Sequence, residues 1–356
     1  MNLPFADSLL EAWVRTRVRA ANPHDSLQSL QLASLERVLL VLTTGLGDAV
    51  LSTPVFPALR RALPRARIGL FVRSAWAELF EADPDLDCVI PYPGKYRRFV
   101  RTLQALRDFR AQLTLVLHGN DPDILPMLYL AGSRNIVRIP TAGTRFRYLL
   151  ANADRAEDAA TIPGWHYIEN RLRILDAVGI APVTRTPRIH LGAKAGDSAR
   201  AFADSPYWVY HAFSAGADKT WPAESSRSFL ERTQAALPSY RIVLTGAPRE
   251  RNMLEHLARG LARTIVLAGR ATLRETAAVL SQAACVVAPD TGMLHLAAAL
   301  DRPVVGLYGP TSASLVGPRA ANARVVVIQA ENTMSRIELD EVLKALTSQL
   351  LPMPRP

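Results

Sequence analysis

The fold is decided by one stretch, ACVVAPDTGMLHLAAALDRPVVGLY, which spans Ala284–Tyr308. The apolar run at its start is typical of a buried strand, and Pro303–Tyr308 predicts the next strand. The segment between these runs therefore predicts a strand-to-helix turn followed by a helix, in a βαβ unit. We expect Asp290 to be the N-cap of this helix, with Thr291 and Gly292 opening its first turn.

A helix that begins directly after a parallel strand favours the binding of an anion. Its free backbone N–H groups and its partial positive charge lie beyond the carboxyl ends of the strands. We expect the amides of Thr291 and Gly292 to hold diphosphate oxygens. His295 follows Gly292 by three residues and shares its side of the helix, so it is a candidate contact for the phosphate or for the group attached to it. The alternative for His295 is a core histidine bonded to the backbone. Asp290 is anionic, so we expect it to orient the loop or to contact a hydroxyl group of the ligand.

Strands and helices alternate along the chain in two series, which predicts two parallel sheets wrapped by helices. Strands of the first series are expected near residues 37–43, 68–72, 88–92, 113–117 and 136–139. Strands of the second are expected near residues 209–213, 241–245, 264–267, 285–288, 304–308 and 325–328. A segment rich in Pro and Gly predicts a linker at residues 181–206. The predicted organisation is an N-terminal extension, a first domain and a second domain, at residues 1–36, 37–190 and 191–356.

Two segments of the first half allow more than one interpretation. In the extension, apolar residues fall at helical spacing with arginines between them, at Leu9, Leu10, Trp13, Val14 and Val18. A helix packed on its own domain is favoured over a helix lying on an anionic membrane surface. The helix expected to end near Leu63 contains Pro54 and Pro57, which predicts either a first-turn placement or a kink.

Composition limits the class of protein and the kinds of partner. The chain has 356 residues, 49% of them hydrophobic and 21% charged, which suits two α/β domains. A formal charge of +10 favours anionic partners: nucleotide-sugars, phosphorylated glycolipid or an anionic membrane surface. Nucleic acid is disfavoured, because the sequence has no zinc spacing, RNP motif or helix-turn-helix pattern.

The two cysteines and the hydropathy pattern bear on the compartment. Cys88 and Cys285 lie inside apolar runs, so we expect buried thiols rather than a disulfide, as in a reducing compartment. The sequence has no run of 18 apolar residues and no secretory signal pattern at the N-terminus. The expected location is cytoplasmic, with the cytoplasmic face of the inner membrane as the alternative.

Three ordered motifs resemble the ADP-heptose:lipopolysaccharide heptosyltransferases, which are glycosyltransferase family nine. The first is the Thr43–Pro54 loop, TTGLGDAVLSTP, and the second is Ser214–Pro222, SAGADKTWP. The third is Pro289–Ala299 with the following Gly309-Pro310-Thr311. The resemblance implies the GT-B fold, in which two Rossmann-like domains with parallel sheets face a central cleft. It places the acceptor on the first domain and the nucleotide-sugar on the second.

The resemblance also implies a reaction. A heptose would pass from ADP-heptose to a phosphorylated lipopolysaccharide core or a related glycan, with inversion at the anomeric carbon and without a metal or other cofactor. Such a transfer needs a base for the acceptor hydroxyl and N–H donors or positive charge for the departing diphosphate.

Asp48 is the candidate base. It follows the turn formed by Gly45 and Gly47, where a ligand can approach the backbone closely, and the resemblance carries the catalytic role to it. A plain N-cap is the alternative for Asp48. A helix N-terminus also stabilises the ionised carboxylate, which weakens it as a base.

Donor contacts are expected from Ser214, Lys219 and Glu250. Lys219 precedes a rigid Trp-Pro pair and could reach a diphosphate as a point charge. A surface lysine in a turn is the alternative, and the resemblance reverses that preference. Ser214 is a second phosphate contact through its hydroxyl. Glu250 would hold the ribose hydroxyls, although a Glu favoured by a helix dipole fits equally well.

Other interpretations stay open at this point. The basic stretch at residues 95–110 would bind acceptor phosphates or lipid head groups, as a peripheral contact with the inner membrane, but a solvated helix face is favoured. The same fold could serve another nucleotide-sugar donor, a protein acceptor or a catalytically silent binding protein. An NAD-dependent dehydrogenase is disfavoured because Gly45 and Gly47 lack the third Gly of that fingerprint.

Overall fold

The computed structural model describes residues 3–20, 30–133, 135–139, 146–152, 162–192 and 205–350. The chain divides into two compact units, residues 1–185 (unit 1) and 186–356 (unit 2). Residues 193–204 of the predicted linker lie outside the described residues. Each expected strand appears within two residues of its predicted ends. Both units are α/β folds with parallel sheets, as the alternating pattern predicts.

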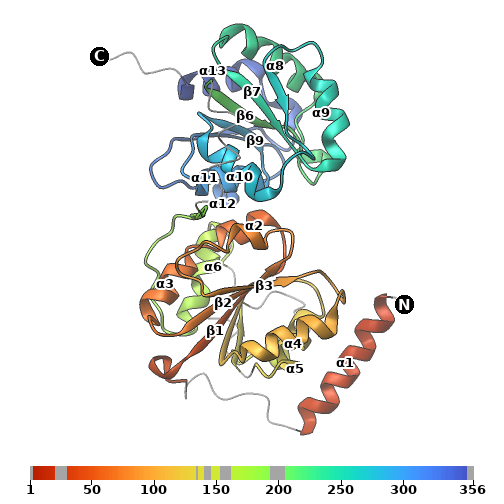
Figure 1. Ribbon diagram of the computed structural model, residues 1–356, viewed down its shortest axis with the longest axis vertical. Coiled ribbons are helices and arrows are strands. Elements are labelled where there is room, and N and C mark those ends of the chain that lie inside the picture. Colours follow the sequence, from red (N-terminus) through yellow and green to blue (C-terminus); the bar gives the residue numbers. More distant parts are fainter. Residues whose placement is uncertain are drawn as a thin grey trace. The chain divides into compact units, whose positions relative to one another are not determined.

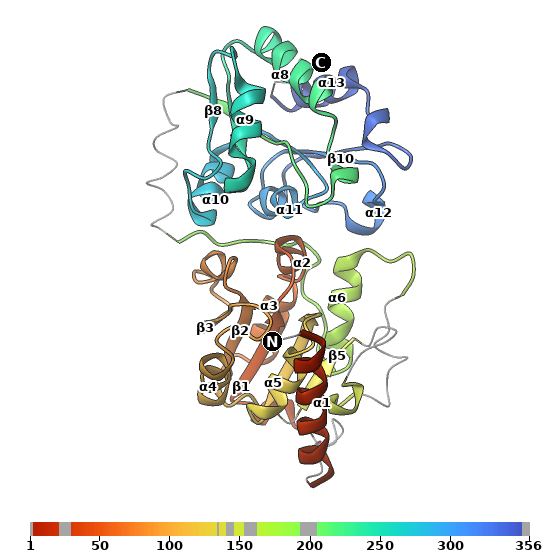
Figure 2. The same cartoon turned by 90° about the vertical axis from the view of Figure 1, so that its right-hand side faces the viewer.

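Unit 1 is built on a five-stranded parallel sheet of order β3-β2-β1-β4-β5. Its strands are β1 (Arg37–Leu42), β2 (Arg67–Arg73), β3 (Cys88–Tyr92), β4 (Leu113–His118) and β5 (Asn135–Arg138). Its helices are α1 (Leu3–Ala20), α2 (Leu46–Leu51), α3 (Val55–Ala62), α4 (Phe99–Phe109), α5 (Ile124–Leu130) and α6 (Tyr167–Asp176). Helices α1, α4 and α5 cover one face of the sheet, and α2, α3 and α6 lie on the other (Figures 1 and 2).

Helix α1 packs on its own unit, as the favoured interpretation predicted. Val14 is fully buried in the core beneath α4 and α5, and Leu10 and Val18 pack beside it. Asp7 forms an ion pair with Lys95 at 3.1 Å, which ties the start of the helix to the loop before α4.

The prolines after the first strand divide the expected long helix into two. Helix α2 ends at Leu51, and α3 begins after Pro54, which is its N-cap. Pro57 lies in the first turn of α3, where its missing N–H costs no hydrogen bond. Because of this break, Asp48 lies in α2, a separate helix of only 6 residues.

Unit 2 is built on a six-stranded parallel sheet of order β11-β10-β9-β6-β7-β8. Its strands are β6 (Tyr207–His211), β7 (Arg241–Thr245), β8 (Thr264–Val266), β9 (Val286–Pro289), β10 (Val304–Tyr308) and β11 (Val325–Gln329). Its helices are α8 (Ala223–Ala236), α9 (Arg251–Ala258), α10 (Leu273–Gln282), α11 (Gly292–Ala299), α12 (Ala313–Val316) and α13 (Leu339–Leu350). The short 3₁₀ turns η7 (Ala217–Lys219) and η8 (Pro248–Glu250) precede α8 and α9.

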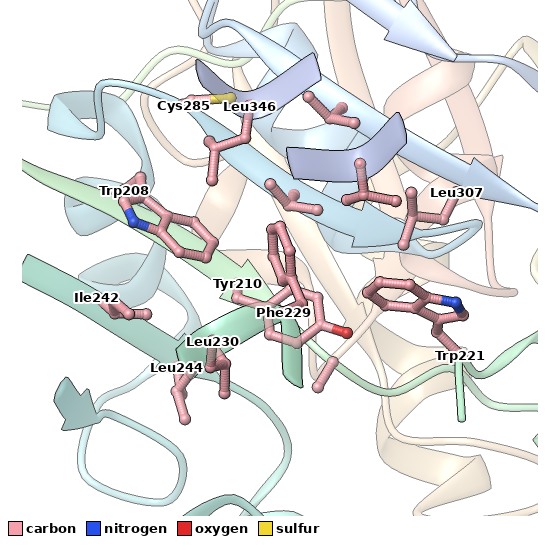
Figure 3. Packing of buried hydrophobic residues seen from close by; sticks show 14 of the residues in the cluster. Trp208, Tyr210, Trp221, Phe229, Leu230, Ile242, Leu244, Cys285, Leu307 and Leu346 are labelled. Carbon is pink, nitrogen blue, oxygen red and sulfur yellow. The ribbon is translucent and has the colours of Figure 1, made fainter. Parts of the chain in front are cut away.

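The core of unit 2 is rich in aromatic side chains (Figure 3). Phe229 of α8 lies against Trp208, Tyr210 and Trp221 at ring-centroid distances of 5.5, 5.7 and 5.7 Å, each in an edge-to-face arrangement. Trp221 is 1% exposed and donates its indole N–H to the Ile337 carbonyl. This buried anchor holds the η7 turn, which lies two residues before it in the chain.

The strand order decides where ligands can bind in each unit. Both orders follow the doubly wound pattern, in which the direction of the strand sequence reverses between two central strands. The reversal lies between β1 and β4 in unit 1 and between β6 and β9 in unit 2. Ligands of such sheets bind outside the carboxyl ends of the strands at this reversal. The loops after β1, β4, β6 and β9 are therefore the places to seek a site.

The remaining sequence predictions concern thiols and membrane spans. Cys285 is buried and Cys88 half-buried, and both are free. Burial raises the pKa of Cys285 to about 12, so it is an inert thiol. In the part of the chain that the structure describes, no helix combines the length and the apolar character needed to cross a bilayer.

Candidate functional site

A polar cluster forms in unit 2 where β6 and β9 end. Lys219 Nζ lies 2.9 Å from Asp290 Oδ2, and the Thr311 hydroxyl donates to the same oxygen at 2.9 Å. The Ser214 hydroxyl donates to the Asp290 backbone carbonyl at 3.2 Å. Three segments far apart in the sequence, those around residues 214–219, 290 and 311, thus meet at the point of strand-order reversal.

Asp290 is the centre of this cluster, and its side chain is 12% exposed. Burial alone would raise the pKa of Asp290. Contacts of the carboxylate with His295, Lys219 and Thr311 outweigh burial and lower the pKa to about 2. The carboxylate is therefore ionised at neutral pH and holds the Lys219 ammonium in place.

The helix start after β9 differs by one residue from the prediction. Thr291, not Asp290, is the N-cap of α11, and its hydroxyl accepts from the Leu294 amide at 3.4 Å. The backbone of Asp290 still belongs to the sheet, since its amide donates to the Leu307 carbonyl, and its carboxylate is already engaged by Lys219. Thr291 is the next residue with a side-chain oxygen and takes the capping position.

The first turn of α11 presents unpaired donors. Among the described residues, the amides of Thr291, Gly292 and Met293 have no hydrogen-bond partner. The backbone of Gly292 is not in the left-handed region, so its conformation does not itself require glycine. A free run of amides beside the ammonium of Lys219 is an arrangement that suits a diphosphate.

His295 lies inside unit 2 and faces Asp290. Its side chain is 5% exposed, and Nε2 lies 3.7 Å from Asp290 Oδ1. Nδ1 is buried and has no hydrogen-bond partner among the described residues. His295 is therefore not the backbone-bonded core histidine of the alternative interpretation.

A cavity of about 530 Å³ adjoins the β6 loop of unit 2. Ser214, Trp221, Arg249, Glu250 and Met253 line it, together with neighbouring loop residues. Glu250 Oε2 accepts from the Ala247 amide at 2.7 Å, so one oxygen caps the η8 turn. Glu250 is also the N-cap of α9, so it lies at a helix start as the helix-dipole alternative expects, and it lines a space of the size that small ligands occupy.

In unit 1, the carboxylate of Asp48 is held on both oxygens. Arg171 Nη2 donates to Oδ1 at 3.1 Å, and the Thr44 hydroxyl donates to Oδ2 at 3.2 Å. His118 Nδ1 lies 3.6 Å from Oδ2. Gly45 is the N-cap of α2, and Asp48 lies in the first turn beyond it. A partly exposed carboxylate with fixed geometry is a suitable proton acceptor.

His118 and Arg171 were missed by the sequence analysis. Burial lowers the pKa of His118 to about 4, and the charge of Arg171 acts in the same direction, so the imidazole is neutral at pH 7. A signal for His118 exists, because it ends β4, the strand beside β1 at the strand-order reversal. Arg171 has no such signal, because it lies 123 positions along the chain from Asp48.

The comparison with known proteins decides the family. Residues 141–346 match the model of glycosyltransferase family 9 (heptosyltransferase), which is more than half of the chain. The chain is 30% identical over 298 residues to lipopolysaccharide heptosyltransferase 1 of Pseudomonas aeruginosa, covering 79% of this chain and 81% of that protein. The chain belongs to glycosyltransferase family 9. It is accordingly a glycosyltransferase.

Further relatives of this family 9 glycosyltransferase cover most of its length. Lipopolysaccharide heptosyltransferase 1 of Salmonella typhimurium is 25% identical, with 86% of this chain and 98% of that protein covered. The crystal structure of a family 9 glycosyltransferase from Veillonella parvula has a TM-score of 0.75 at 18% identity, covering 90% and 98% of the two chains. The Escherichia coli heptosyltransferase WaaC with ADP has a TM-score of 0.68 at 24% identity, covering 88% and 99%. These structures establish the two-domain GT-B fold.

An Asp-Pro-Asp stretch at residues 121–123 of the glycosyltransferase has the form of a metal-binding pair. Its carboxylates are used inside the protein instead: the Tyr92 hydroxyl contacts both at 2.9 Å, and the Tyr96 amide donates to Asp123. Among the described residues, no group of three or more His, Cys, Asp or Glu side chains is placed to hold a metal ion.

Two surface features of the glycosyltransferase can now be placed. Most basic side chains of residues 95–110 are exposed on and before α4, as a solvated helix face would be, while Lys95 pairs with Asp7. His166 is the N-cap of α6, and its Nδ1 accepts from the Ile168 amide at 3.2 Å.

Proposed function

We propose that this glycosyltransferase transfers a heptose from ADP-heptose to a lipopolysaccharide core or a related glycan, with inversion at the anomeric carbon. The observation that carries the proposal is the cluster of Lys219, Asp290 and Thr311 beside the free amides of α11. The relatives named as lipopolysaccharide heptosyltransferases and the E. coli enzyme that was solved with ADP support the donor class.

The donor occupies unit 2 in this proposal. The amides of Thr291 and Gly292 and the ammonium of Lys219 bind the diphosphate, and Ser214 lies beside them. Glu250 and the adjoining cavity hold the nucleoside, and the ribose hydroxyls would bond to Glu250 Oε1, which lies 3.5 Å from Arg249 Nη2. His295, which faces Asp290 from α11, contacts the transferred sugar. Negative charge builds up on the departing diphosphate as its bond to the sugar breaks. These fixed donors stabilise that charge, which lowers the barrier to reaction.

The acceptor occupies the first domain, where Asp48 is the base. As the acceptor hydroxyl attacks the anomeric carbon, its proton passes to the Asp48 carboxylate, and the bond between that carbon and the diphosphate breaks. Gly45 and Gly47 leave room for the acceptor beside the backbone. The reaction takes place in the cytoplasm, at the inner-membrane face where a lipid-linked acceptor would be presented.

A thermal-shift panel followed by a transfer assay tests the proposal. A ligand that binds only the folded protein at 100 times its Kd adds about 2.7 kcal/mol of stability, so ADP should raise the Tm more than UDP, GDP or NAD does. Incubation with ADP-heptose and a lipopolysaccharide acceptor lacking heptose should then yield a product heavier by one heptose. Stabilisation by UDP or GDP in place of ADP would indicate another donor, and ADP binding without product would indicate a silent binding protein.

A further inference from the structure

The hydroxyl of Thr44 lies between two groups that can each accept its hydrogen, the Asp48 carboxylate and His118 Nδ1. It donates to Asp48 Oδ2 at 3.2 Å, and its oxygen lies 2.5 Å from His118 Nδ1. A hydroxyl has a single hydrogen to donate, although its oxygen can also accept. Both contacts are hydrogen bonds only if His118 carries its hydrogen on Nδ1. The order of donation is then His118 to Thr44 and Thr44 to Asp48.

This order fixes the state of the histidine. Burial lowers the pKa of His118 to about 4, so the ring is neutral at pH 7 and carries one hydrogen, on Nδ1. Nε2 is left as a bare acceptor, and no described residue hydrogen-bonds to it. The neutral ring therefore donates toward the carboxylate without adding a positive charge beside it.

The carboxylate is thereby held from two sides by different elements. Arg171 of α6 fixes Oδ1, and Thr44, supported by His118 at the end of β4, fixes Oδ2. Two hydrogen-bonded anchors prevent rotation of the carboxylate about its bond to Cβ. Each oxygen retains a lone pair for an incoming proton.

We propose that His118 is a positioning residue for sugar transfer, which acts through the Thr44 hydroxyl to orient the Asp48 carboxylate toward the acceptor hydroxyl. The inference rests on the proposed function, in which Asp48 receives the acceptor proton. During the reaction the acceptor oxygen bonds to the anomeric carbon, and the electron pair of the broken bond leaves with the diphosphate. His118 and Thr44 keep their own hydrogens throughout.

Substitution of His118 by asparagine or by glutamine distinguishes the roles of its two ring nitrogens. In His118→Asn the side-chain NH₂ takes the place of Nδ1–H and can still donate to Thr44. In His118→Gln the amide reaches the place of Nε2, and the donor to Thr44 is lost. A misplaced base costs up to about 100-fold in rate, so we expect His118→Gln to lower kcat by about 10- to 100-fold and His118→Asn to recover most of that loss. The KM values for donor and acceptor should change less than threefold.

Thr44 supplies a matched control for the same relay. Thr44→Val removes the hydroxyl at equal volume and should lower kcat about as much as His118→Gln, whereas Thr44→Ser keeps the hydroxyl and should lose less. Because both residues act on one carboxylate, the double variant His118→Gln/Thr44→Val should be no slower than the worse single variant. Thermal melting of each variant identifies losses that come from unfolding.

Three results would overturn the inference. The first is an equal loss of kcat in His118→Asn and His118→Gln, and the second is a loss of kcat in the double variant that equals the product of the two single losses. The third is a change in the KM for the acceptor with kcat preserved, which would mean that Nε2 contacts the acceptor itself. The assay of the wild-type protein distinguishes failure of this inference from failure of the proposed function. If the wild type transfers no heptose, the proposed function fails; if it does and the variants match it, only the role of His118 fails.

Discussion

Replacement of Lys219 by alanine is the sharpest test of the donor site. Lys219 Nζ lies 2.9 Å from Asp290 Oδ2, so the ammonium is held at the start of α11 before any ligand arrives. With Lys219 and Asp290 both present, the pair is formally neutral; Lys219→Ala leaves an unbalanced carboxylate beside the amides that would bind the diphosphate. The substitution therefore removes an attraction and also exposes a repulsion.

The magnitude follows from the kind of bond that is lost. A hydrogen bond to a charged group contributes about 1.5–3 kcal/mol, and each 1.4 kcal/mol is tenfold in Kd. Titration calorimetry with ADP should show Kd weakened by about 10- to 100-fold, and kcat/KM with ADP-heptose should fall at least as far, because the charge also acts during bond cleavage.

Two controls make the result decisive. Lys344→Ala removes a lysine from α13, on the opposite face of the unit 2 sheet from α11, and should leave ADP affinity unchanged. The double variant Lys219→Ala/Asp290→Asn removes both charges and should recover part of the affinity lost in Lys219→Ala. ADP affinity within twofold of the wild type in Lys219→Ala would refute the assignment of the diphosphate to this cluster.

Three further predictions concern unit 2. Asp290 has a pKa of about 2 against an ordinary value of 3.8, so its carboxylate contributes about 2 kcal/mol of stability that is fully present above pH 3.8 and is lost as the pH falls through 2. Urea unfolding should show Asp290→Asn less stable than the wild type by about that amount at pH 7, with the difference narrowing below pH 4; a difference that does not change with pH would contradict this. Gly292→Val should abolish ADP binding in calorimetry with little change in Tm, since its Cβ branch would crowd the amides, and normal binding would move the diphosphate elsewhere. Trp221→Ala should lower the unfolding free energy by about 3–5 kcal/mol, measured by denaturant titration, because it empties a fully buried aromatic site, and a loss under 1 kcal/mol would show that the η7 turn does not depend on this anchor.

Much of the fold could be predicted because its strands are short apolar runs between turn residues. Val304–Tyr308 and Arg241–Thr245 lie where the pattern places them, since a buried parallel strand needs apolar side chains on both faces. The final helix begins at Leu339, and a separate 3₁₀ turn at Met334–Arg336 precedes it. Hydrophobic periodicity does not distinguish such a turn from a helix start.

The candidate site was less accessible to sequence reasoning, because most of its contacts are long-range. Asp290 and Lys219 could each be singled out from local turn chemistry, but their ion pair joins residues 71 positions apart. The same separation explains the wrong N-cap: Asp290 is a strong capping residue in isolation, and only the distant lysine withdraws its carboxylate from that role. His118 and Arg171 were missed for this reason, since neither is part of a motif and only folding brings them to Asp48.

The role of Asp48 is tested most directly by single-turnover kinetics of Asp48→Asn with ADP-heptose and a heptose-free lipopolysaccharide acceptor. Asparagine keeps the shape of the side chain but has a single oxygen to accept from either Arg171 or Thr44, and it cannot take up a proton. The account predicts a rate lower by about 10²- to 10⁴-fold with ADP affinity within twofold of the wild type. A rate within a few-fold of the wild type would contradict it and remove Asp48 from the role of base.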